Sequence, residues 1–161
     1  MTGPTQNLEL ALARWVLNEL PPEDVPMVAT EALVHGCNAM SVAVLAGLQR
    51  PTSADIEEEL PALLEELRVS LPERREALKI HVDAVARDIV LGVVTPSVGA
   101  SQISSASYAA ERGELWDQFA TFVGLALEYE EENRPAAELD PVTVADAKAL
   151  LAAGGLQITP G

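Results

Sequence analysis

The sequence predicts an all-α fold, a single compact domain of seven or eight helices of unequal length around a central helix at about residues 72–94. Three observations predict it. Alanine, the residue with the highest helix propensity, occurs 25 times among the 161 residues. Apolar residues recur at spacings of three and four along most of the chain, as they do on one face of a helix. No two strand-like runs with alternating polarity are joined by a hairpin turn.

The central segment, residues 72–94, has the clearest helical pattern in the chain. Five apolar side chains follow one another at spacings of four, three, four and four: Leu78, Val82, Val85, Ile89 and Val93. Ile80, Ala84 and Leu91 form a second apolar face, and polar side chains fill the narrow side between the two. A helix with two apolar faces is expected to pack against neighbours on both flanks.

Three helices are expected ahead of this region. The first, at about residues 7–20, starts at Asn7 and stops before two prolines. The second, at about residues 22–36, carries acidic residues in its first turn and ends at Gly36, which suits a left-handed C-terminal cap. The short run 41–48 is interpreted as a helix, because no other strand-like run is available to pair with it.

A fourth helical segment is expected at about residues 52–69. Thr52 and Asp55 have the spacing of an N-terminal capping box. Pro61 falls within the apolar stripe, and a proline removes a backbone donor from the helix interior. Either the helix kinks at Pro61, or one short helix ends near Leu60 and another starts with Pro61 in its first turn, and we expect the break.

Three further helices are expected after the central one. Residues 97–110 are small and polar, so a Ser-rich flexible segment is the alternative there. Residues 114–132 contain Phe119 and Phe122, which we assign to the core. The last helix is expected to use Asp140 as its cap and Pro141 as its first residue, and to stop at the glycine pair 154–155. A short flexible tail is expected at about residues 155–161.

The length and the charge limit the class of protein. A chain of 161 residues fits one domain, 1–161, that needs no metal or disulfide staple. The net charge of −15 argues against binding to nucleic acid, whose affinity for proteins comes largely from cations on phosphates, and against an anionic membrane. A basic protein partner fits this charge. The alternative is that the charge only keeps the protein soluble.

The N-terminus has no basic segment followed by an apolar core, so no signal peptide is predicted. Cys37 is the only cysteine and has no intramolecular partner. No apolar run reaches the roughly 20 residues that cross a bilayer. We expect a cytoplasmic protein.

Three metal-ligating residue types lie close together at Glu31, His35 and Cys37. Their spacing lacks the second pair of ligands that makes a zinc motif specific. A histidine near a helix C-terminus is also favoured by the helix dipole, and this capping role is our preferred interpretation.

His81 and Asp88 are seven residues apart on the central helix and hence on the same side of it. A base oriented by a carboxylate would also need a nucleophile or a substrate pocket, which the sequence does not mark. A buried or half-buried polar pair is the preferred interpretation. Phosphate-binding glycine motifs and G-x-S-x-G are absent from the sequence, so we expect no cofactor.

Acidic residues gather in two places that lack basic residues. The first patch consists of Asp55, Glu57, Glu58, Glu59, Glu65 and Glu66. The second consists of Glu128, Glu130, Glu131 and Glu132, at the C-terminal end of a predicted helix, where the dipole disfavours negative charge. Such a local conflict is suggestive of function, and the alternative is a solvated acidic helix end that continues into a loop. We assign partner binding to the second patch, because it adjoins an aromatic-rich helix.

Three segments, ALVHGCNAMSVAVLAGL, IVLGVVTPSVGASQI and FVGLALEYEEEN, resemble a group of small acidic helical proteins of actinobacterial type whose function is uncharacterised. The resemblance covers about residues 25–133 and rests on these positions: Gly36, Leu45, Gly47, Gly92, Pro96, Gly99, Phe122 and Gly124. It implies a helical fold and assigns no catalytic residue.

Two classes of function remain. The favoured one is a non-enzymatic interaction protein, such as an immunity protein or adaptor, whose acidic surface binds a basic partner. The alternative is a metal-binding protein or small enzyme that uses Glu31, His35 and Cys37, or His81. Metal analysis of the purified protein distinguishes the two.

Overall fold

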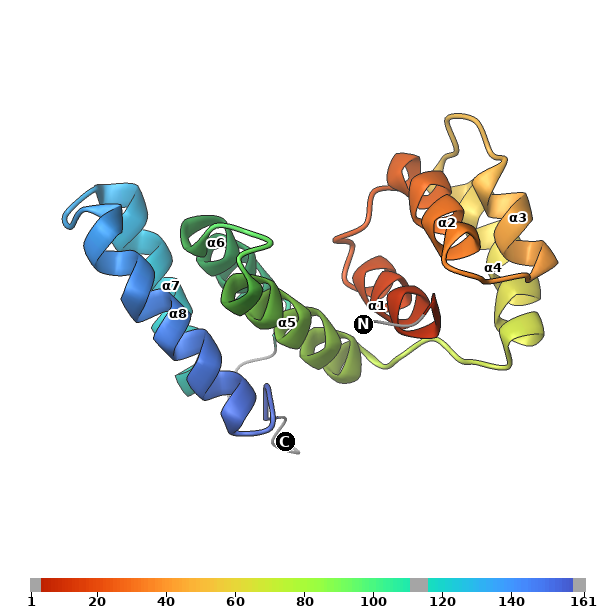
Figure 1. Cartoon of the computed structure of the whole chain (residues 1–161). Helices are drawn as coiled ribbons and strands as arrows, with labels where there is room; N and C mark the ends of the chain where they lie inside the picture. Colours follow the sequence, from red (N-terminus) through yellow and green to blue (C-terminus); the bar gives the residue numbers. More distant parts are fainter. Residues whose placement is uncertain (1–3, 111–115, 158–161) are drawn as a thin grey trace. The chain divides into compact units, whose positions relative to one another are not determined.

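The structure is a computed structural model that describes residues 4–110 and 116–157. Over these ranges it contains α-helices, one 3-10 helix and no strand, which confirms the all-α prediction (Figure 1). The elements are α1 (Pro4–Val16), η1 (Pro22–Asp24), α2 (Val25–Val34), α3 (Met40–Ala46), α4 (Ser53–Leu67), α5 (Arg74–Leu91), α6 (Pro96–Ser107), α7 (Trp116–Glu131) and α8 (Ala136–Ala152).

Contacts group the chain into two compact units, residues 1–77 and 78–161. The first unit contains α1 to α4, and the second contains most of α5 together with α6, α7 and α8. The prediction that the chain forms one domain stays a prediction.

The first unit is held together by an apolar core to which all four of its helices contribute. Its buried members are Leu12, Val25, Ala29, Ala32, Val42, Leu45, Ile56, Leu60 and Leu63. Trp15 is partly buried against this core. α1 ends at Val16, earlier than expected, because Asn18 adopts a left-handed conformation (φ 59°) and the Glu19 N–H donates back to the Arg14 carbonyl.

α2 ends as predicted, at a left-handed glycine. Gly36 has φ 105°, and the Cys37 N–H donates to the Ala32 carbonyl at 3.0 Å. The short run that follows forms a helix, α3, as expected. The chain therefore reverses between α2 and α3, which pack closely on each other.

α4 confirms one prediction and corrects another. Its capping box is present, with the Thr52 N–H donating to the Asp55 carboxylate at 2.8 Å and the Asp55 N–H donating to Thr52 Oγ1 at 3.3 Å. The predicted break at Pro61 is wrong, because α4 runs through that residue. Pro61 and Glu57, whose carbonyl loses its helical donor, are both exposed, so water can satisfy the carbonyl.

In the second unit, α5 stops at Leu91, before the predicted end at residue 94. Gly92 is left-handed (φ 74°). Leu91 and Val93 are 74% and 68% exposed, so the prediction that they lie on packed apolar faces is wrong. The Ser-rich segment after it does form a helix. In α6, Thr95 caps the N-terminus through the Val98 N–H, and Gly99 lies so close to Ile89 that a Cβ there would overlap it.

α7 and α8 run side by side and in opposite directions (Figure 1). Phe119 and Phe122 of α7 are buried, as predicted. The predicted start of α7 at residues 114–115 lies outside the described residues. α8 begins at Ala136, and Pro141 lies inside it, so the prediction of Asp140 as cap and Pro141 as first residue is wrong. Extension to residue 136 buries Leu139 completely, and the N–H that Pro141 lacks would have met the carbonyl of exposed Ala137.

Residues 155–157 are held more firmly than predicted. Leu156 is 1% exposed, its N–H donates to Asp83 Oδ1 at 2.7 Å, and Lys79 Nζ donates to its carbonyl at 3.2 Å. Gly155 is left-handed (φ 82°), and a Cβ on it would overlap Asp83. The flexible tail predicted from residue 155 is therefore wrong for residues 155–157, and residues 158–161 lie outside the described residues.

Candidate interaction surface

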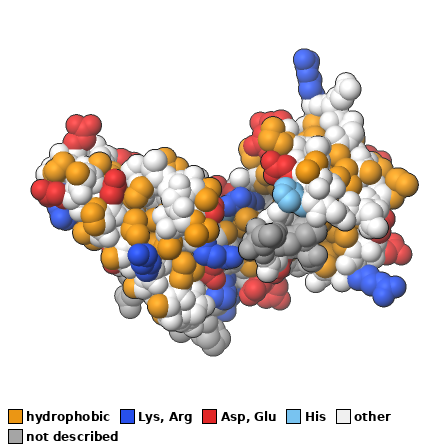
Figure 2. All heavy atoms as spheres, in the orientation of Figure 1, with side chains coloured by type: hydrophobic (Ala, Val, Ile, Leu, Met, Phe, Trp, Pro, Cys, Tyr) orange, Lys and Arg blue, Asp and Glu red, His pale blue; other side chains and the backbone are white. Residues whose placement is uncertain are grey.

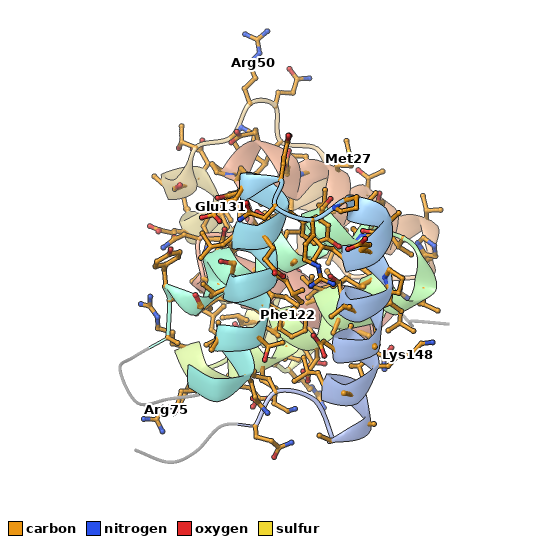
Figure 3. The ribbon with its side chains drawn as sticks, turned by 90° about the vertical axis from the view of Figure 1, so that its left-hand side faces the viewer. Met27, Arg50, Arg75, Phe122, Glu131 and Lys148 are labelled. Carbon is orange, nitrogen blue, oxygen red and sulfur yellow. The ribbon has the colours of Figure 1, made fainter. Side chains whose placement is uncertain are left out.

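The predicted partner-binding glutamates, Glu128, Glu130, Glu131 and Glu132, lie where α7 ends and turns into α8. We call residues 128–140 the acidic turn. It holds six carboxylates and one basic residue, Arg134. Acidic side chains are visible over this end of the α7–α8 pair in Figure 2, and Figure 3 shows Glu131 at the end of α7.

A partly buried polar contact joins the end of α7 to the start of α8 within the acidic turn. The Tyr129 hydroxyl donates to Asp140 Oδ1 at 2.8 Å and lies 3.0 Å from Thr143 Oγ1. Thr143 is fully buried and donates to the Leu139 carbonyl. Burial raises the pKa of Tyr129 to about 12, so the phenol stays a neutral donor at ordinary pH. The two helix ends are thereby tied across the turn.

Neutralisation of the charge within the turn is partial. Arg134 lies 3.7 Å from Glu128 and 3.6 Å from Glu138, both at the exposed surface. Glu131 accepts a hydrogen bond from Asn133 at 2.6 Å. Glu130 and Glu132 are exposed, and the described part of the chain shows no hydrogen bond or ion pair for their side chains. The turn therefore presents uncompensated negative charge.

Two of the aromatic side chains of α7 are buried away from this surface. Phe119 and Phe122 are 1% and 3% exposed, so they are not available to a partner, and the side chain of Trp116 lies outside the described residues. Leu127 is 49% exposed instead. It precedes Glu130 and Glu131 by three and four residues, which places the three on one face of α7. Leu127 therefore offers an aliphatic contact beside the glutamates.

The first acidic patch belongs to α4, and two of its six carboxylates serve the fold. Asp55 closes the capping box, and hydrogen bonds from the Thr52 backbone and hydroxyl lower its pKa. Glu66 accepts hydrogen bonds from the Ser41 N–H at 3.1 Å and the Ser41 hydroxyl at 3.2 Å. Ser41 lies in the first turn of α3, so Glu66 satisfies a donor that this helix start leaves without an intrahelical partner.

Glu31, His35 and Cys37 are not arranged as a metal site. His35 caps α2, its Nδ1 lying 2.7 Å from the Glu31 carbonyl oxygen, which confirms the capping interpretation. Cys37 is partly buried against the core of the first unit. Among the described residues, no group of three or more His, Cys, Asp or Glu side chains is placed to hold a metal ion.

His81 is buried at 5% exposure and Asp88 is half-buried, as expected for polar residues of a packed helix. Another polar side chain of α5, that of Asp83, has a structural role that its hydrogen bonds define. Asp83 accepts from Lys79 Nζ at 3.0 Å and from the Leu156 N–H, and so fastens the segment that follows α8. This pair was expected only as part of a polar side of the helix.

A groove between α7 and α8 was missed by sequence reasoning. It has a volume of about 290 Å³, and its polar residues are Gln118, Thr121 and Asp146. Burial raises the pKa of Asp146. One signal was present in the sequence. Asp146 follows Thr143 by three residues and precedes Leu150 by four, so a carboxylate falls beside the buried stripe of α8.

The first unit contains a smaller cavity of about 40 Å³ that is lined by apolar side chains. Half-buried Leu8, Trp15, Leu20 and Leu67 border it, together with core residues of α2, α3 and α4. It offers no group for chemistry, and an apolar space of this kind stays dry.

No protein-family model, no curated protein and no solved structure matches this chain. Within the described ranges, the helices lack the combination of length and apolar character that crossing a membrane requires.

Proposed function

We propose that this chain is a non-enzymatic cytoplasmic interaction protein, of the kind that an immunity protein or adaptor represents, and that its acidic turn binds a basic protein partner. One observation carries the proposal. Glu130 and Glu132 stand exposed, without compensating partners among the described residues, on a turn that Tyr129 fastens to α8. A charged surface held in one place loses little conformational entropy on binding.

The position of the charge supports the same conclusion. Glu128, Glu130 and Glu131 lie in the last turn of α7, where the partial negative charge of the helix end opposes them. The fold gains nothing from carboxylates there, and an exposed pair with Arg134 contributes at most about 1 kcal/mol. A basic partner would relieve this repulsion.

A surface whose charges all have the same sign attracts an oppositely charged protein before the two make contact. Exposed charges attract an oppositely charged protein over roughly a Debye length, about 8 to 10 Å at physiological salt, and so raise the rate of association. Leu127 adds an aliphatic contact on the same face as Glu130 and Glu131. We expect the turn to steer a basic partner by charge and to retain it partly by apolar contact.

The test is a pull-down from the lysate of the source cell. The bait is either the wild-type chain or a variant with Glu128, Glu130, Glu131 and Glu132 changed to Gln. We expect the wild type to capture a basic protein at low salt and to lose part of it at moderate salt. The variant is expected to capture little of it at either salt concentration. A toxin gene beside the gene for this chain would identify that partner as the toxin.

A matched control separates this site from total charge. Changing Glu57, Glu58, Glu59 and Glu65 to Gln on α4 removes the same four charges and leaves Asp55 and Glu66 in their capping roles. This control is expected to capture the partner as the wild type does. Equal recovery by all three proteins at both salt concentrations would leave solubility as the role of the acidic turn.

A further inference from the structure

The groove between α7 and α8 combines one carboxylate with apolar walls. Asp146 of α8 and Thr121 of α7 supply a carboxylate and a hydroxyl, and Phe122, Ala149 and Leu150 supply apolar surface. Its volume of about 290 Å³ is at the lower limit of the roughly 300–1,000 Å³ that drug-sized ligands need. The groove therefore suits a single side chain or a small molecule.

No group of the protein compensates Asp146 across the described residues, which show no ion pair or hydrogen bond for its carboxylate. Lys148, two residues along α8, projects away from α7 (Figure 3). The third polar side chain of the groove is already engaged, since Gln118 Oε1 accepts from the Gln157 N–H at 2.9 Å. Asp146 and Thr121 are left as the acceptors in the groove.

Glu128 of the acidic turn lies on the same side of α7 as the groove. It follows Thr121 by seven residues, two helical turns, which keeps the two on one face. The rise between them is about 10 Å along the helix. A partner that contacts Glu128 can therefore reach the groove without crossing to another face of α7.

We propose that the groove receives the side chain of a lysine from the basic partner, with the ammonium group on the Asp146 carboxylate and the Thr121 hydroxyl and the methylene stem against Phe122, Ala149 and Leu150. This deepens the proposed function and rests on its premise that the partner is basic. A lysine carries three donors on an aliphatic stem, which matches two acceptors above apolar walls. Burial of Asp146 adds to the match, because a cation offsets the cost of a partly desolvated carboxylate.

The experiment uses the full ¹⁵N-labelled chain and blocked tripeptides as probes. Acetyl-Gly-Lys-Gly-amide is titrated and followed through the backbone amide signals, with acetyl-Gly-Glu-Gly-amide as the probe of opposite charge. We expect saturable shifts at Gln118, Thr121 and Asp146 with the lysine peptide and none with the glutamate peptide. n-Butylammonium, a free amine with the same stem, is expected to bind the same residues more weakly, because it lacks the peptide backbone.

Two variants and one matched control locate the interaction. D146N removes the charge, and T121V removes the hydroxyl while keeping the shape. We expect D146N to raise Kd by about fivefold, in line with the loss of one ion pair of about 1 kcal/mol, and T121V to raise it less. E57Q makes the same charge change on α4 and is expected to leave Kd unchanged. Wild-type-like spectra of the free variants show that they are folded.

Three results would overturn the proposal. They are the absence of saturable shifts at the groove in wild type, an unchanged Kd in D146N, and binding of n-butylammonium without binding of the peptide. The acidic turn is tested separately. A lysine peptide that shifts only residues 128–134, and loses affinity only when these glutamates become Gln, rejects the groove and supports the turn. Shifts at the groove together with a negative pull-down reject the turn and leave the groove.

Discussion

The two acidic surfaces of this protein carry the same number of carboxylates and use them differently. On α4, Asp55 and Glu66 accept hydrogen bonds at the starts of α4 and α3, where negative charge complements the helix dipole. On the acidic turn, the glutamates of α7 lie at the wrong end of their helix, and Tyr129 holds them there. Hydrogen bonds at helix starts explain two carboxylates of the α4 patch, whereas the glutamates at the end of α7 call for another role.

The largest effect is expected from a change to a carboxylate that stabilises the fold. Changing Glu66 to Ala removes the acceptor for the backbone N–H and hydroxyl of Ser41, a residue that is 7% exposed. We expect the free energy of unfolding to fall by about 1 to 2 kcal/mol, the usual cost of a lost helix cap. Urea denaturation measures it. Glu66→Gln keeps an acceptor and is expected to lose less, and an equal loss in both variants would mean that the charge itself matters.

The next effect concerns the anchor of the acidic turn. Tyr129→Phe removes the hydroxyl that contacts Asp140 and Thr143 and keeps the ring. Loss of these hydrogen bonds is expected to cost about 1 kcal/mol. Hydrogen exchange should accelerate at the α7–α8 turn and stay unchanged in α4. Unchanged exchange at the turn would show that Tyr129 does not fasten it.

A smaller effect is expected for the capping carboxylate of α4, and it depends on pH. The pKa of Asp55 is lowered in the folded state, so its contribution is present above the unfolded pKa and disappears as pH falls through the folded value. Asp55→Asn is therefore expected to be less stable than wild type at neutral pH and to match it in strong acid. Denaturation at both pH values measures this difference, and a deficit that persists in acid contradicts the account.

The smallest effect has the opposite sign. Burial raises the pKa of Asp146, so its charged form disfavours folding above that pKa, and the penalty disappears as pH falls through it. Asp146→Asn is expected to stabilise the chain by a few tenths of a kcal/mol at neutral pH, within the range of surface substitutions, and by nothing in acid. Thermal denaturation of both proteins at the two pH values tests the sign.

The sequence predicted the helices well and their interruptions less well. Periodicity located the buried faces of α4 and α7, and capping residues located the start of α4 and the end of α2. Pro61 and Pro141 misled the prediction for one reason. Each lies on an exposed side of its helix and frees a carbonyl of an exposed residue, so the missing hydrogen bond costs less than a break would. Whether that carbonyl is exposed depends on tertiary packing, which the sequence pattern does not display.

The groove was harder to foresee than the acidic turn, for a physical reason. The turn is a local run of like charges, which a sequence displays directly. The groove joins Thr121 and Asp146, which are 25 residues apart, and depends on how α7 and α8 face each other. The same holds for Glu66 and Ser41, whose hydrogen bonds also span 25 residues. When tertiary packing brings distant side chains together, the sequence shows at most a polar residue beside an apolar stripe.

The most direct test of the central claim, that charge on the acidic turn and not on α4 binds the partner, is the association rate of the captured basic protein. Stopped-flow compares the wild type with the two four-glutamate variants, each of which changes the net charge from −15 to −11. We predict that the variant of the acidic turn associates about tenfold more slowly at low salt and loses most of its salt dependence, whereas the α4 variant behaves as the wild type. Equal rates for the two variants would contradict the account.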